Sequence, residues 1–156
     1  MLYIVYCMLY IDVNYMGFVR WFKKKFGLHI REINIKKSVV DDLCYMAQEA
    51  HPKEMLAFLS STRGIIGGVV HIDEIQLQAY DASEDMANVM LSNIPMTTNI
   101  VGTVHSHPGG STRPSSADVH LFGKFGFVHA IIGEPYVEGK ICFYDKQGRA
   151  IVVKVV

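Results

Sequence analysis

Hydrophobic and polar residues alternate over positions 29–36, in a stretch rich in β-branched side chains, and this period of two predicts a first strand. The spacing then becomes helical. Ser38 followed three positions later by Asp41 matches a capping box. One face of the predicted helix carries the apolar residues Val39, Val40, Leu43, Met46, Ala47 and Ala50. Because Pro52 biases the residue before it away from the helical region, we expect this helix to end near His51.

Apolar runs along the rest of the chain predict the other strands of an α/β domain. We expect these strands at residues 54–60, 69–80, 100–106, 127–132, 140–144 and 149–156. A second helix is predicted over 116–126, and the segment 86–98 fits either a strand or a short helix. The chain shows no internal repeat, which excludes the repeat folds. The predicted fold class is therefore α/β, with one mixed β-sheet and two principal helices.

Chain length, charge balance and cysteine spacing limit the classes of protein to which the chain can belong. A chain of 156 residues is close to the commonest size for one domain, and half of it is hydrophobic, so we expect a single well-buried core. The 15 basic residues equal the 15 acidic ones, which argues against nucleic acid as a partner. The 3 cysteines are widely spaced without a Cys-x-x-Cys pair, so they indicate neither a thiolate zinc site nor a disulfide framework. We therefore expect a cytoplasmic protein with reduced cysteines.

The segment 1–27 differs in character from the rest and is interpreted as an N-terminal extension. Its opening apolar run of 11 residues is shorter than the ~20 that cross a bilayer, and no basic region precedes it as in a signal peptide. Phe18, Phe22 and Phe26 then recur at helical spacing around a run of three lysines. Three interpretations stay open: peripheral contact with an anionic membrane surface, docking on the domain core or in a homo-oligomer, and an extension of no particular function. The chain would begin at Met16 if the upstream residues are not translated.

The stretch VHSHPGGSTRPSSADV carries the strongest chemical signal. His105 and His107 are two positions apart in a predicted strand, so both imidazoles point to one face and can close on a single ion. Pro108 ends the strand, and GGSTRPSS is expected to form a flexible turn into the second helix, with Asp118 in the first helical turn. Two histidines and one carboxylate leave a fourth position for water, which is typical of catalytic rather than structural zinc.

Two further residues would complete a hydrolytic site. Ser115 lies three positions before Asp118, where its hydroxyl can donate a hydrogen bond to an oxyanion on a substrate or simply cap the helix. Glu54 opens an apolar strand (EMLAFL), where a carboxylate facing the core would be costly unless it acts as a base beside an ion. The alternative for Glu54 is an exposed residue at a strand end. His120 and His129 are interpreted as structural.

These residues fit the pattern His-x-His-x₇-Ser-x-x-Asp through His105, His107, Ser115 and Asp118, with Glu54 in AHPKEMLAFL at the place of an upstream glutamate. In this pattern the chain resembles a JAMM (MPN+) metalloprotease of the compact archaeal or bacterial type. The resemblance implies a single MPN (JAMM) domain with a cytidine-deaminase-like fold and one Zn²⁺ per chain. It also implies that the two histidines and the aspartate hold zinc, that the glutamate is the general base for zinc-activated water, and that the serine steadies the tetrahedral intermediate.

The resemblance covers residues 28–156 and leaves the extension 1–27 outside it. It implies a peptidase or isopeptidase that cleaves after the C-terminal glycine of a ubiquitin-like modifier, which in an archaeon means a small archaeal modifier protein or its conjugates. Two alternatives stay open. A zinc amidohydrolase acting on a small molecule or a sulfur-carrier adduct would use the same groups, and a non-catalytic MPN scaffold would share the fold.

Overall fold

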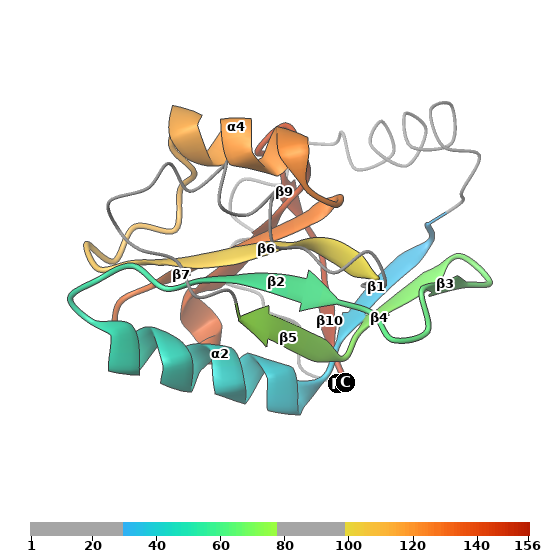
Figure 1. Ribbon diagram of the computed structural model, residues 1–156, viewed down its shortest axis with the longest axis horizontal. Helices are drawn as coiled ribbons and strands as arrows, with labels where there is room; N and C mark the ends of the chain where they lie inside the picture. The colour runs from blue at the N-terminus through green and yellow to red at the C-terminus, as the bar shows by residue number, and fades with distance from the viewer. Residues whose placement is uncertain (1–29, 78–98) are drawn as a thin grey trace.

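The computed structural model of the protein describes residues 30–77 and 99–156 (Figure 1). They form the strands β1 (Glu32–Ile35), β2 (Leu56–Ser60), β3 (Ile65–Ile66), β4 (Val69–Ile72), β5 (Glu74–Leu77), β6 (Ile100–His107), β7 (Val128–Gly133), β8 (Ile141–Tyr144), β9 (Ala150–Ile151) and β10 (Lys154–Val155). The helices are α2 (Lys37–Ala50), α4 (Ser116–Lys124) and the short 3₁₀ helix η2 (Glu138–Lys140). The predicted α/β class is confirmed.

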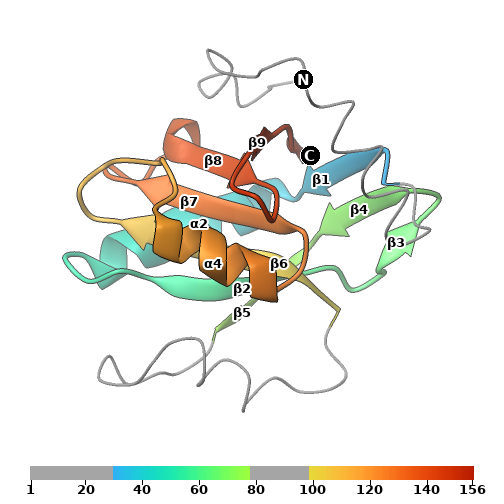
Figure 2. The same ribbon diagram turned by 90° about the horizontal axis from the view of Figure 1, so that it is seen from above.

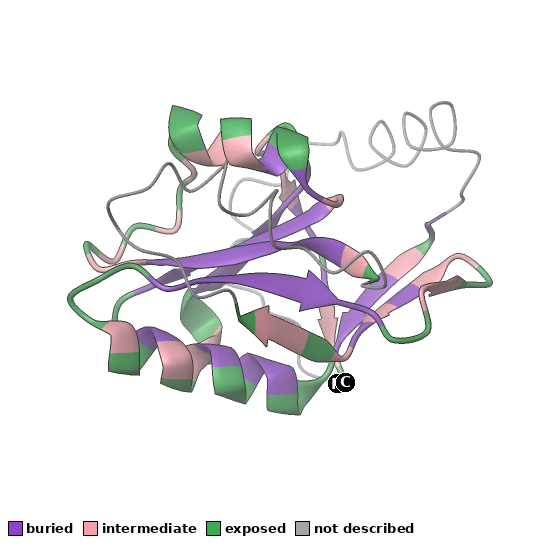
Figure 3. Ribbon diagram, viewed as in Figure 1, coloured by how far each residue is buried: buried purple, intermediate pink, exposed green. Residues whose placement is uncertain are grey.

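A 6-stranded mixed sheet with the order β5-β2-β6-β7-β8-β9 forms the centre of the fold. Only β6 and β7 are parallel to each other within this sheet. α2 covers one face and α4 the other (Figure 1). Side chains alternate between the two layers along β8, because Ile141 and Phe143 join the core beneath α2 while Tyr144 packs with Phe122 of α4. The central strands are therefore buried on both faces (Figure 3).

The remaining strands form a second, 4-stranded sheet with the order β10-β1-β4-β3, which corrects the prediction of one sheet. The predicted strand 69–80 is divided at Asp73 into β4 and β5, which belong to different sheets, and positions 78–80 lie outside the described ranges. The carboxylate of Asp73 accepts hydrogen bonds from the backbone N–H and the hydroxyl of Thr62 at 2.8 and 2.5 Å. The backbone N–H of Asp73 donates to the carbonyl of Ser60 at 3.1 Å. These contacts hold the chain where it passes from one sheet to the other.

The start of α2 also differs from the prediction. The residue before Lys37 is the N-cap and makes no side-chain capping bond, so the capping box predicted for Ser38 and Asp41 is wrong. The reason is tertiary: the backbone N–H of Lys37 donates to the carbonyl of Val156 at 2.8 Å, so a neighbouring strand end fixes the first turn. Asp41 forms an ion pair with Lys37 instead. The predicted end of the helix near His51 is confirmed.

Two predictions concern segments outside the described ranges, namely the interpretations of 1–27 and the undecided element at 86–98. Within residues 30–77 and 99–156, no helix combines the length and the apolar character needed to cross a membrane. Within the described ranges, Cys44 is a free cysteine.

Candidate metal centre

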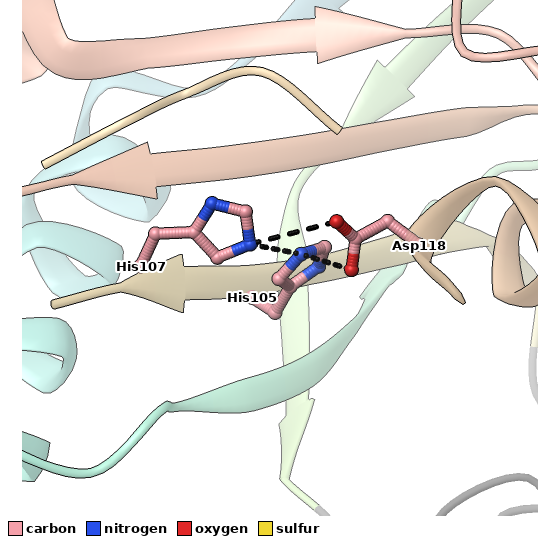
Figure 4. A group of neighbouring side chains, drawn as sticks. All are labelled: His105, His107 and Asp118. Carbon is pink, nitrogen blue, oxygen red and sulfur yellow. Dashed lines mark hydrogen bonds and ion pairs between the residues drawn. The ribbon is translucent and has the colours of Figure 1, made fainter. Parts of the chain in front are cut away.

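β6 carries both histidines to the face of the sheet that α4 covers. The Nε2 atoms of His105 and His107 lie 3.1 Å apart (Figure 4). His105 is buried, and its ring lies beside the ring of Phe122 from α4 with a centroid distance of 6.1 Å. His107 is the last residue of β6 and remains partly exposed. The period of two along this strand therefore brings two imidazole nitrogens to one point.

α4 supplies the third side chain, Asp118. Its Oδ1 lies 3.0 Å from Nε2 of His105, and its Oδ2 lies 3.6 Å from Nε2 of His107. The possible ligand atoms of these three residues all lie within 4.8 Å of one another. Figure 4 shows the carboxylate facing both rings from the opposite side of the site. A strand and a helix, joined by one loop, thus place three metal-ligating groups together.

Ser115 is the N-cap of α4 and forms a capping box with Asp118. The Ser115 hydroxyl accepts a hydrogen bond from the backbone N–H of Asp118 at 3.2 Å, and the Asp118 carboxylate accepts one from the backbone N–H of Ser115 at 2.6 Å. The capping role considered for Ser115 is therefore realised, and the box fixes the direction of the carboxylate.

The Asp118 carboxylate and the tautomer of His107 both favour the binding of a cation. Burial would raise the pKa of Asp118, but the contact with His105 and the hydrogen bonds with Ser115 outweigh burial and hold that pKa well below its usual value. The carbonyl of Ser111 accepts a hydrogen bond from Nδ1 of His107 at 2.8 Å, which places the proton on Nδ1 and leaves the Nε2 lone pair for a metal. An ionised carboxylate and imidazole nitrogens without a thiolate fit a divalent cation such as Zn²⁺.

Glu54 does not open β2 as predicted, because it lies two positions before the first residue of that strand, and its side chain is exposed rather than facing the core. This exposed position avoids the cost of burying a carboxylate. The alternative of an exposed residue at a strand end therefore describes the position of Glu54 correctly.

β2 begins beside the first histidine, two residues after Glu54. Leu56 pairs with His105 in antiparallel register. The backbone N–H of the intervening Met55 donates to the Ser106 hydroxyl at 2.8 Å, and the Ser106 N–H donates back to the Met55 carbonyl at 2.9 Å. If this register continued to Glu54, its side chain would lie opposite His107 and on the same face as both histidines. Sequence reasoning missed Ser106, although a serine between two histidines in an apolar strand is a signal for a buried polar contact.

The other two histidines on this side of the sheet lie outside the cluster. His120 is exposed on α4. His129 is buried in β7, where Phe122 stacks on it with a centroid distance of 4.3 Å and Thr103 bonds its Nδ1 at 2.9 Å. Burial lowers the pKa of His129 to about 3, so this imidazole is neutral. It supports Phe122, which in turn lies against His105.

Comparisons with known proteins agree with this site. Residues 36–144 match the family described as prokaryotic homologs of the JAB domain. A protein of Haloferax volcanii named a probable metalloprotease is 31% identical over 121 residues, which are 74% of this chain and 74% of that protein. A JAB1/MPN domain protein from Archaeoglobus fulgidus has a structure with 31% identity and a TM-score of 0.62, covering 79% of this chain and 98% of that one. A structure described as JAMM, a metalloprotease-like zinc site in the proteasome and signalosome, has 31% identity and a TM-score of 0.61, with 80% and 98% covered.

The fold, the cluster of two histidines and an aspartate, and these similarities define a JAMM-type metalloprotease-like domain. The chain belongs to the JAMM/MPN+ family, among the prokaryotic homologs of the JAB domain. The arrangement of two helices and mixed sheets is the fold that the sequence resemblance implied.

Proposed function

We propose that the protein is a zinc-dependent isopeptidase or peptidase that hydrolyses the bond after the C-terminal glycine of a ubiquitin-like modifier, such as a small archaeal modifier protein. One observation carries the hydrolytic part. The side chains of His105, His107 and Asp118 converge at one point, and the pairing of Leu56 with His105 supports a place for Glu54 beside it. Membership of a metalloprotease-like family supports a peptide or isopeptide bond as the target.

His105, His107 and Asp118 would hold one Zn²⁺ per chain. Three N and O donors leave an open position, as catalytic zinc requires. When bound, zinc would polarise the scissile carbonyl and lower the pKa of a water molecule. Asp118 is ionised at neutral pH because its pKa is low, so it loses no proton when the metal binds.

Glu54 is the proposed general base, and the end of β2 suits that role. An exposed carboxylate two residues before the partner of His105 can take a proton from water and pass it to the leaving amine. Because the Glu54 side chain is exposed, a protein substrate can reach it from solvent.

Ser115 is the proposed donor to the oxyanion of the tetrahedral intermediate. Its hydroxyl oxygen accepts the hydrogen bond from Asp118, and a hydroxyl can accept and donate at the same time. The Ser115 proton can therefore point toward a substrate oxygen that develops negative charge. Capping and catalysis are compatible at this position.

The test compares the wild type with Glu54→Gln and with Lys53→Gln, which removes the charge of the exposed neighbouring residue. Each protein is incubated with a ubiquitin-like protein extended beyond its terminal glycine, and its zinc content is measured. We expect about one zinc per chain in all three proteins and cleavage at the glycine by the wild type and Lys53→Gln. Glu54→Gln should keep its zinc and cleave at least about 100-fold more slowly.

Other outcomes of the zinc and cleavage measurements would point to different conclusions. A wild type without zinc, or a Glu54→Gln variant as active as the wild type, would overturn the mechanism. Hydrolysis of small amides without cleavage of the modifier would point to an amidohydrolase. Zinc binding without hydrolysis of either substrate would point to a scaffold.

A further inference from the structure

Residues 108–115 form the loop that connects the strand ligands to the helix ligand, and we refer to it as the connecting loop. At its start, the backbone N–H of Gly110 donates to the carbonyl of His107 at 3.0 Å, and Nδ1 of His107 donates to the carbonyl of Ser111 at 2.8 Å. At its end, Ser115 caps α4 and binds Asp118. The loop therefore contacts one metal-ligating side chain at each end, which corrects the expectation of a merely flexible turn.

The connecting loop lies over the end of β7 (Figure 2), and its middle contacts Gly133 of β7 and the side chain of Tyr144 in β8. The hydroxyl of Tyr144, at the end of β8, donates a hydrogen bond of 2.6 Å to the carbonyl of Thr112. Gly133, at the end of β7, lies so close to the loop that a Cβ there would overlap the Gly110 carbonyl and approach Thr112 Cγ2 to 3.2 Å. The loop is thus held by a buried donor and by a close backbone contact.

The two histidines differ in how their second ring nitrogen is held. Nδ1 of His107 donates to Ser111, whereas Nδ1 of His105 is buried and has no hydrogen-bond partner among residues 30–77 and 99–156. A hydrogen bond at the second nitrogen sets the orientation and the tautomer of a metal-binding imidazole. The orientation of His107 therefore depends on the position of the Ser111 carbonyl, which belongs to the peptide unit next to the one that Tyr144 binds.

We infer that Tyr144 is a positioning residue for the metal centre: its hydroxyl fixes the connecting loop, and the loop fixes the imidazole of His107 through Ser111. The Tyr144 hydroxyl donates to the loop carbonyl of Thr112, so its effect on the cluster passes through the loop. The inference rests on the metal-binding part of the proposed function and not on the identity of the substrate.

The test uses Tyr144→Phe, which deletes the hydroxyl and keeps the buried ring. The matched control is Tyr136→Phe, because Tyr136 is also buried and its hydroxyl bonds His51 Nδ1 at 2.9 Å, outside the connecting loop. Zinc affinity is measured by competition with a chelator, and thermal unfolding of the metal-free proteins checks the fold. We expect Tyr144→Phe to bind zinc about tenfold more weakly, and Tyr136→Phe to bind it as the wild type does.

Two further measurements separate positioning from a general loss of stability. The visible absorption of bound Co²⁺ reports the ligand geometry and should change in Tyr144→Phe but not in Tyr136→Phe. Gly133→Ala displaces the loop from its other side and should also weaken zinc binding. Wild-type zinc affinity in both Tyr144→Phe and Gly133→Ala would overturn the inference and leave the proposed function intact. A wild type that binds no zinc would overturn the proposed function and this inference with it.

Discussion

The Oδ1 atom of Asp118 lies 3.0 Å from Nε2 of His105, although one residue belongs to α4 and the other to β6. The second carboxylate oxygen of Asp118 accepts a hydrogen bond from the backbone N–H of Ser115. The same side chain therefore belongs both to the first turn of the helix and to the candidate metal site. The packing of Phe122 on His129 holds the same helix against the sheet. The position of the Asp118 carboxylate therefore depends on how α4 begins and on how it packs.

This dependence gives a test for the two roles of Ser115. Ser115→Ala and Ser115→Gly both remove the hydroxyl, but Gly is tolerated at an N-cap and Ala is not. We expect the free energy of unfolding to fall by about 1 kcal/mol in the Ala variant and by only a few tenths in the Gly variant. If the hydroxyl stabilises an oxyanion, kcat should fall by about 100-fold in both variants. Turnover that follows stability instead would reduce Ser115 to a helix cap.

His129 predicts a pH dependence of stability. Burial lowers its pKa to about 3 in the folded protein, whereas an unfolded chain titrates histidine near ~6.5. Between these values the unfolded state binds one more proton, so stability decreases as the pH falls below ~6.5, by at most about 1.4 kcal/mol per pH unit. Urea unfolding of the metal-free protein at pH 7 and pH 5 should show a smaller loss for His129→Gln than for the wild type. Equal losses would contradict the neutral, buried state of His129.

Gly102 tests the packing of the two parallel strands at the centre of the fold. A Cβ at Gly102 in β6 would overlap the backbone carbonyl of its β7 partner Val128, and backbone atoms cannot move aside as a side chain can. We expect Gly102→Ala to lose more than about 4 kcal/mol of unfolding free energy or to fail to fold. Gly123→Ala in α4 is the control, because a Cβ there meets no atom within 4 Å and should stabilise the helix by about 0.5–1 kcal/mol. Similar thermal unfolding of both variants by circular dichroism would contradict the pairing described for these strands.

The structural features that could be predicted from the sequence are those that depend on the spacing of nearby residues. Histidines two positions apart in a strand must share a face, and an aspartate three positions after an N-cap serine must lie in the first turn of a helix. The apolar face of α2 followed in the same way from its period, and Val39, Val40, Leu43 and Ala47 are buried there. In each case residues a few positions apart determine the outcome.

Features that depend on distant contacts could not be predicted. The division of one expected strand into β4 and β5 depends on Thr62, which binds Asp73 across a turn. The start of α2 depends on the carbonyl of Val156 at the other end of the chain. The order of the connecting loop depends on Tyr144 and Gly133, and no local pattern in GGSTRPSS signals either contact.

The most direct test of the proposed metal centre is a crystal structure of the zinc-loaded protein, with anomalous diffraction data collected at the zinc absorption edge. We expect one anomalous peak per chain, bonded at about 2.0–2.2 Å to Nε2 of His105, Nε2 of His107 and the carboxylate of Asp118. A fourth position should be open on the side of Glu54. A peak at other residues, or a fourth protein ligand that closes the site, would contradict a catalytic metal centre.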